Sequence, residues 1–184
     1  FVTTLPFDEV RISVENIVGV NTGETKVFRS VIKNLCSVDL ECDETYFLSE
    51  PTFPVIINSD QTGIFGVACV ACSVNNSPNV ISEVQTDFAT ITVVAGVLAT
   101  GDISVQDPLS TYPAGSTAGF VIEDTNTLIQ ADLFSSINIC TYLDGVEQEC
   151  QTAGNLIELS LLGIWINPGP GIYNVGFVVS LPFD

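Results

Sequence analysis

Hydrophobic and polar residues alternate with a period of two along much of this chain. Apolar and polar residues take turns through residues 10–15, and residues 28–33 place apolar and basic side chains on opposite faces. Runs rich in β-branched residues at 88–94, 103–105 and 120–122 extend the pattern. A period of two predicts β-strands, each with one face toward a core.

Short turn-forming segments separate these apolar runs. Each segment contains Gly, Pro, Asn or Asp, and they lie at 21–23, 95–96, 100–102, 113–115, 144–145 and 167–171. Many short strands between such turns are typical of an antiparallel β-sandwich. The fold class predicted is therefore all-β, a jelly-roll or immunoglobulin-like sandwich.

The same octet stands near both ends of the sequence. Residues 1–8 read FVTTLPFD and residues 177–184 read FVVSLPFD. Such self-similarity predicts one period of a tandem array. Residues 1–35 would then complete the sandwich of the preceding repeat, 36–73 would form a small Cys-rich connector, and 74–184 would form the main sandwich, continued into the next repeat.

Charge is distributed very unevenly. The net charge is −18, and residues 34–184 contain no Lys or Arg. This excludes nucleic acid as a partner, because phosphate binding needs clustered cations. No apolar run is long enough for a membrane-spanning helix, and without an initiating Met or signal segment we expect a mature or internal stretch. The four cations are expected to contact a neighbouring repeat: Arg11, Lys26, Arg29 and Lys33.

Six cysteines, with no Met and no His, indicate an extracellular protein. One pair follows from local geometry, because an Asp-Gly turn signal lies between Cys140 and Cys150. A three-residue loop over 144–146 would place Leu143 opposite Glu147 and Cys140 opposite Cys150. Directly opposed residues are close enough for a disulfide.

The other four cysteines are Cys36, Cys42, Cys69 and Cys72. Structural disulfides are the favoured interpretation, with the pairing left open. A zinc site is an alternative, although no histidine could share the coordination. Thioredoxin-like chemistry needs a Cys-x-x-Cys at the start of a helix, and no helix-start signal precedes Cys69.

Candidate catalytic chemistry is sparse. Without histidine there is no Ser-His-Asp or Cys-His system, and no Gly-rich phosphate-binding motif is present. The paired acids at 8–9, 43–44 and 123–124 lie at predicted strand ends and turns, so we do not expect an enzyme. A carbohydrate-binding jelly-roll module remains an alternative, with aromatic candidates Tyr46, Tyr112, Tyr142, Trp165 and Tyr173.

Residues 79–91 run from a short acidic turn into a Phe-Ala-Thr-Ile strand. This stretch resembles the beginning of galactose-binding-like jelly rolls, in which the acidic turn commonly binds Ca²⁺. The resemblance implies Glu83 and Asp87 as candidate Ca²⁺ ligands. The usual Asp-Gly-Asp sequence is missing here.

Four stretches together resemble a known class of repeats: the run FVTTLPFDEVRI at 1–12, GVACVAC at 66–72, DFATI at 87–91 and LSTYPAGSTAGF at 109–120. They are similar to repeats of giant cell-surface adhesins of Bacteroidota, such as the mobile filamentous adhesin of gliding flavobacteria, exported by type IX secretion. The resemblance implies an extracellular, cell-surface filament repeat that supports adhesion or gliding. Its expected partners are neighbouring repeats, like subunits and surface glycans. A self-assembling subunit of an extracellular fibre is a further alternative.

Overall fold

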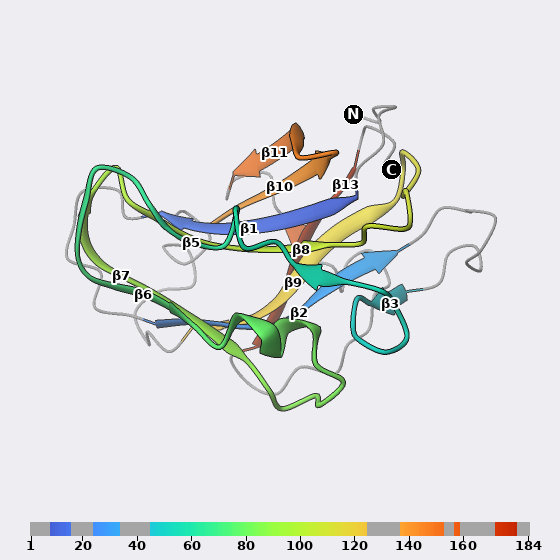
Figure 1. Cartoon of the computed structure of the whole chain (residues 1–184), viewed down its shortest axis with the longest axis horizontal. Coiled ribbons are helices and arrows are strands. Elements are labelled where there is room, and N and C mark those ends of the chain that lie inside the picture. Colours follow the sequence, from blue (N-terminus) through green and yellow to red (C-terminus); the bar gives the residue numbers. More distant parts are fainter. Residues whose placement is uncertain are drawn as a thin grey trace.

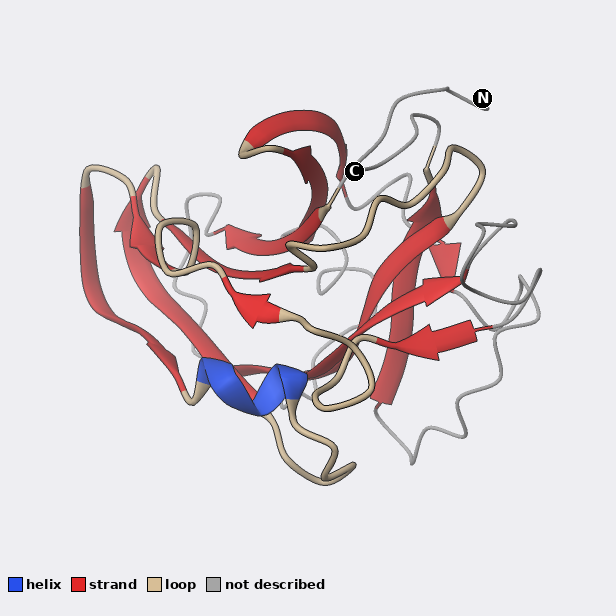
Figure 2. Cartoon of the chain, turned by 45° about the vertical axis from the view of Figure 1, so that its right-hand side comes forward, coloured by secondary structure: helices blue, strands red, loops and turns tan. Residues whose placement is uncertain are grey.

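The protein is an antiparallel β-sandwich, as predicted. The computed structural model describes residues 8–15, 24–33, 45–124, 137–152, 157–158 and 172–179. These residues form two antiparallel sheets and one short 3-10 helix, η1 (Ser77–Ile81), and contain no α-helix. Figures 1 and 2 show the two sheets facing each other, with η1 at one side.

The first sheet has the strand order β11-β10-β1-β8-β4, and β5 also pairs with β8. Its strands are β1 (Glu9–Glu15), β4 (Ile56–Ile57), β5 (Gly63–Phe65), β8 (Thr100–Gln106), β10 (Ile137–Leu143) and β11 (Val146–Thr152). The second sheet has the order β12-β13-β9-β2-β7-β6, and β3 also pairs with β2. Its strands are β2 (Glu24–Lys33), β3 (Thr45–Phe47), β6 (Ala68–Asn75), β7 (Ala89–Val97), β9 (Thr117–Asp124), β12 (Ile157–Glu158) and β13 (Ile172–Val178).

The core lies between the sheets and is built from the apolar positions of the alternating pattern. Both sheets contribute buried residues, among them Val10, Ile12, Val14, Val27, Ile32, Ile91, Ile103, Val105, Phe120, Ile122, Ile137, Ile139, Val175 and Phe177. Removing these side chains from water is the main favourable contribution to folding.

The expected domain boundaries are wrong for the strands that the structure describes. β1 lies between β10 and β8, and β2 lies between β9 and β7, all in the same chain. Residues 9–15 and 24–33 therefore complete their own sandwich and not that of a preceding repeat. The physical reason is core completion, because Val10, Ile12 and Val14 are at most 4% exposed there.

The segment expected to be a separate connector is also part of the sandwich. β3 pairs with β2, β4 and β5 pair with β8, and β6 pairs with β7. These short strands add to the edges of both sheets, and Val55 and Phe53 are buried in the common core. The remainder of the 36–73 segment, residues 36–44, lies outside the described residues, as do residues 1–7.

One edge of the sandwich is closed by a bent pair of strands. The β6–β7 pair of the second sheet continues into the β5–β8 pair of the first (Figure 1, left). The bend falls at Gly66, with φ 116°, and at Leu98, with φ 50°. A Cβ on Gly66 would collide with the Leu98 carbonyl oxygen, so the close approach of the two chains requires glycine there.

The first and last described parts of the sandwich lie at the same end of it. The Asp107 amide donates to the Asp8 carbonyl oxygen at 2.7 Å. The Val179 amide donates to the Ser116 carbonyl oxygen at 2.7 Å, and the Gly115 amide donates to the Val179 carbonyl oxygen at 2.8 Å. The 107–116 segment therefore binds both places where the chain enters and leaves the sandwich.

Candidate functional site

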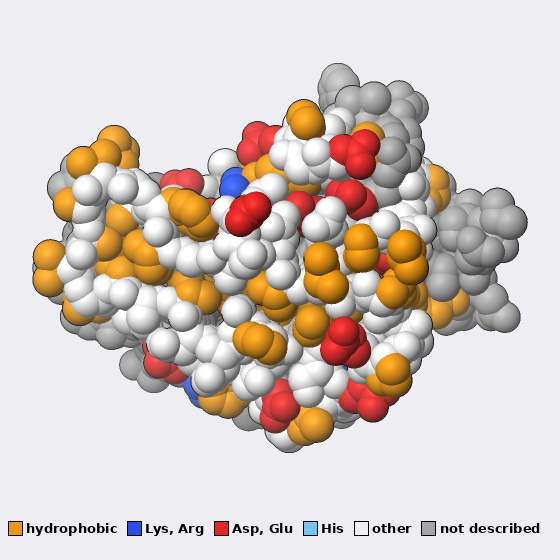
Figure 3. Space-filling view, viewed as in Figure 1, with side chains coloured by type: hydrophobic (Ala, Val, Ile, Leu, Met, Phe, Trp, Pro, Cys, Tyr) orange, Lys and Arg blue, Asp and Glu red, His pale blue; other side chains and the backbone are white. Residues whose placement is uncertain are grey.

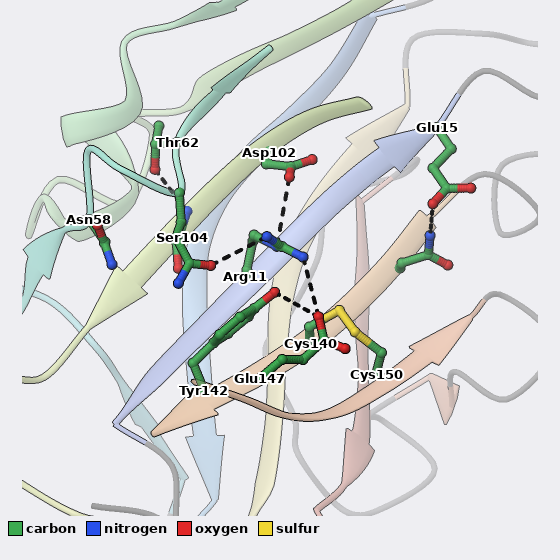
Figure 4. Close-up of polar contacts among 12 residues, drawn as sticks. Arg11, Glu15, Asn58, Thr62, Asp102, Ser104, Cys140, Tyr142, Glu147 and Cys150 are labelled. Carbon is green, nitrogen blue, oxygen red and sulfur yellow. Dashed lines mark hydrogen bonds and ion pairs between the residues drawn. A yellow bond between two sulfur atoms is a disulfide. The ribbon is translucent and has the colours of Figure 1, made fainter. Parts of the chain in front are cut away.

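The outer face of the first sheet carries a cluster of polar side chains, several of them buried. Since Val10, Ile12 and Val14 of β1 face the core, Glu9 and Arg11 lie on the opposite face. The β1–β8 register places Ser104 beside Arg11, and Asp102 lies two residues before Ser104 in β8. Figure 4 shows Arg11 at the centre of this group, which we call the Arg11 cluster.

Glu9 joins this sheet to the loop between β4 and β5. Its carboxylate is fully buried and accepts hydrogen bonds from Asn58 Nδ2 at 2.9 and 3.0 Å and from Ser104 Oγ. The Ser104 amide in turn donates to Thr62 Oγ1 at 3.0 Å. Burial raises the pKa of Glu9, while the Ser104 and Asn58 hydrogen bonds oppose the rise.

Arg11 lies between two carboxylates and against an aromatic ring. Its Nε is 3.7 Å from Asp102 Oδ2, and an Nη is 3.7 Å from Glu147 Oε2. The other Nη donates to Gln61 Oε1 at 3.3 Å, and Cζ lies 4.8 Å from the Tyr142 ring centroid. Burial raises the pKa of Asp102, and the Arg11 charge lowers it. The guanidinium therefore offsets the cost of desolvating the neighbouring carboxylates.

The Arg11 cluster binds the loop around residues 58–62 to the sheet. Its amide and hydroxyl donors are directed at the buried Glu9 carboxylate, and its cation is directed at Asp102 and Glu147. A third desolvated carboxyl, Asp8, accepts from Gln106 Nε2 at 3.2 Å, and burial raises its pKa. These interactions support a structural role for the cluster.

Sequence reasoning did not find this cluster. Alternation in β1 was a signal that Glu9 and Arg11 share a face, but the covering loop is distant in sequence. Asn58 and Glu9 are 49 residues apart, and no local pattern indicates that contact.

The predicted disulfide between Cys140 and Cys150 is present beside the Arg11 cluster (Figure 4). The turn differs from the expected three-residue loop. It has two residues, with positive φ at Asp144 and Gly145, so Leu143 lies opposite Val146. A β-bulge further along β11 shifts the register, and this shift brings the two cysteines opposite each other.

A second disulfide joins Cys69 and Cys72 within β6. Cys36 and Cys42 lie outside the described residues, so their state stays a prediction. Within the described ranges, the one group of three or more potential metal ligands is Cys140, Glu147 and Cys150. Both sulfurs there belong to the disulfide and offer no thiolate to a metal.

The candidate Ca²⁺ ligands are not assembled into a larger group. Glu83 is exposed, and Asp87 Oδ2 accepts a hydrogen bond from Ser82 Oγ at 3.1 Å. Neither acid has two further acidic or cysteine ligands close by in the parts of the chain that the structure describes. A Ca²⁺ site here stays a prediction.

Three of the four cations that were expected to contact a neighbouring repeat make contacts within their own chain. Arg11 contacts its own sheet, and Lys26 Nζ lies 3.0 Å from Glu123 Oε2 on the adjacent strand. Arg29 is 7% exposed and lies over an aromatic ring of β3, and burial lowers its pKa. Lys33 belongs to β2, but its side chain is not described. Contacts between strands of the same chain therefore engage three of the four cations, and a contact with a neighbouring repeat stays a prediction.

The tyrosines suggested for sugar stacking are buried or half-buried where the structure describes them. Tyr112 and Tyr142 are buried, and Tyr46 and Tyr173 are half-buried. Tyr112 donates to Asp107 Oδ2 at 2.8 Å. Trp165 lies outside the described residues. The described tyrosines therefore give no support to the carbohydrate-binding alternative.

In the described parts of the chain, no helix is long and apolar enough to span a membrane.

Comparisons with known proteins give no match. No family model, no curated protein and no solved structure matches this chain.

Proposed function

We propose that this chain is a structural module of an extracellular, cell-surface filament that supports adhesion or gliding. The observation that carries the proposal is the position of its disulfides. β11 and β6 are edge strands of the two sheets as described; Cys140–Cys150 joins β11 to β10, and Cys69–Cys72 lies within β6. Disulfides persist in oxidising compartments, and the bond that joins β11 to β10 opposes local opening of that edge.

The surface and the polar groups support the same proposal. A net charge of −18 favours a soluble, self-repelling coat. The buried carboxylates Glu9 and Asp102 are engaged in anchoring contacts within the fold. These contacts favour a structural role for the outer face of the first sheet.

The first and last described residues of the sandwich suggest how such a module would be displayed. Asp8 and Val179 are both bound to the 107–116 segment at one end of the sandwich. Neighbouring modules of an array would therefore attach at that end, and each sandwich would project to the side of the line that joins them. Lateral projection exposes most of each module to partners.

Surface labelling tests the proposal. Antibodies raised against the folded module should bind intact cells that produce the parent protein, without permeabilisation. Deletion of the coding region should remove the label and reduce surface attachment or spreading. An antibody to a cytosolic protein serves as the permeability control. Labelling that requires permeabilisation would contradict the proposal, as would turnover of a glycan or peptide by the purified module.

A further inference from the structure

The bend between the sheets carries a group of exposed apolar side chains. Phe65, Val67, Val70 and Leu98 are 41%, 77%, 71% and 80% exposed. We call these four residues the apolar corner. Exposed apolar residues are common singly, but a contiguous group indicates a contact surface.

The strand register places Phe65, Val67 and Leu98 around the bend. Ala68 pairs with Val97, so the preceding Val67 lies across from Leu98. Phe65 pairs with Thr100 on the other side of the bend. Val70 lies two residues into β6, opposite Ala95, and extends the exposed apolar surface from the bend onto this edge strand. Hydrophobic side chains gather at this end of the molecule in the space-filling view (Figure 3, left).

The apolar corner lies in the uncharged part of a strongly acidic protein. No charged residue occurs from Gln61 to Ser82, or from Phe88 to Gly101. These two stretches supply β5, β6, β7 and the start of β8. The remainder of the chain carries the whole net charge of −18, so two copies approach each other with least repulsion through this end.

β6 also offers a strand edge. It is the terminal strand of the second sheet and pairs with β7 on one side among the described strands. An edge strand with apolar, uncharged side chains is a template for pairing with another strand. Ala71, with φ 56°, leaves a gap in the β6–β7 pairing, which limits the length of straight edge.

We propose that the apolar corner and the β6 edge form a homophilic contact, in which a second copy of this chain docks symmetrically. The two β6 strands lie antiparallel about a two-fold axis and join the second sheets of the two copies. A second copy is the occupant that fits, because it presents the same uncharged surface, while a basic partner would be drawn to the acidic faces. The short edge makes this a weak, concentration-dependent dimer.

Analytical ultracentrifugation of the full chain over a range of concentrations tests the proposal. We expect a monomer–dimer equilibrium that Val70→Asp weakens by ~10-fold or more, since a charge there is desolvated and faces its own copy. The matched control is Leu109→Asp, which adds the same charge at a residue 80% exposed outside the corner. It should leave the dimer constant close to that of the wild type.

Salt gives a second readout. Screening of the net charge should strengthen the dimer as ionic strength rises, whereas contact with a basic partner would weaken. Val67→Asp repeats the test at the bend, and melting curves of each variant confirm folding. A monomer at every concentration in high salt would overturn the proposal and assign the corner to a different partner. Equal loss in Leu109→Asp and Val70→Asp would also overturn it. Neither result bears on surface labelling, so the two proposals fail separately.

Discussion

Removal of the Cys140–Cys150 disulfide measures how much the edge of the first sheet contributes to stability. The variant is Cys140→Ala/Cys150→Ala. Alanine is preferred to serine because Cys140 is 2% exposed. A serine hydroxyl at this position would be buried without a hydrogen-bond partner provided for it. The ladder between β10 and β11 otherwise keeps all of its pairs.

The expected cost follows from the length of chain that the bond closes. The two cysteines are 10 residues apart, and the loss of loop-closure entropy in the unfolded chain corresponds to about 3 kcal/mol. Cys69 and Cys72 are 3 residues apart, which corresponds to about 2 kcal/mol. The double variant at 140 and 150 should therefore be the less stable of the two by about 1 kcal/mol.

Urea and thermal unfolding of purified protein under oxidising conditions give both values. A loss of about 3 kcal/mol should lower the melting temperature by about 6–12 °C for a chain of this length. Cys69→Ala/Cys72→Ala is the matched control, since it also removes two sulfurs and one bond. Equal stability of the wild type and Cys140→Ala/Cys150→Ala, or the reverse ranking of the two variants, would refute the loop-entropy reasoning.

Three further predictions concern single buried residues. Burial raises the pKa of Glu9 above its ordinary value of 4.5. The folded state therefore binds the carboxyl proton more tightly than the unfolded chain does, and stability falls as the pH rises through the raised pKa. Glu9→Gln should flatten the pH dependence of the melting temperature, and an unchanged profile would contradict this. Gly101→Ala should cost ~1–3 kcal/mol in urea titrations, because the new methyl group collides with Cγ2 of Ile91; a neutral effect would show that the core yields there. Tyr112→Phe should cost ~1–3 kcal/mol, because the fully buried Asp107 carboxylate loses a donor at 2.8 Å; wild-type stability in thermal unfolding would argue against that hydrogen bond.

Local patterns predicted the local features of this fold. Alternation located β1, runs rich in β-branched residues located β7 and β9, and the Asp144–Gly145 turn signal predicted the pairing of Cys140 with Cys150. The loop length was wrong, because the sequence does not distinguish a three-residue turn from a two-residue turn followed by a bulge. Both arrangements oppose the same two cysteines.

The pairing of strands distant in sequence could not be predicted from local patterns. The repeated octet suggested that the early strands serve another copy, but β1 pairs with β8 and β10 of its own chain. A strand with one apolar face fits any sheet that needs that face, so the pattern alone does not select the partner. The covering of Glu9 by Asn58 is hidden for the same reason, since it depends on a loop that returns over the sheet.

The 107–116 segment binds both Asp8 and Val179, so the first and last described residues of the sandwich lie at the same end of it. A linker that joined those two residues would turn the described sandwich into a ring, which could then be opened at the exposed Asp144–Gly145 turn. Such a circular permutant keeps every strand partner, and Cys140–Cys150 would hold its new ends together. The order of strands along the polypeptide thus depends on where the ring is opened, whereas the sheets and the core do not.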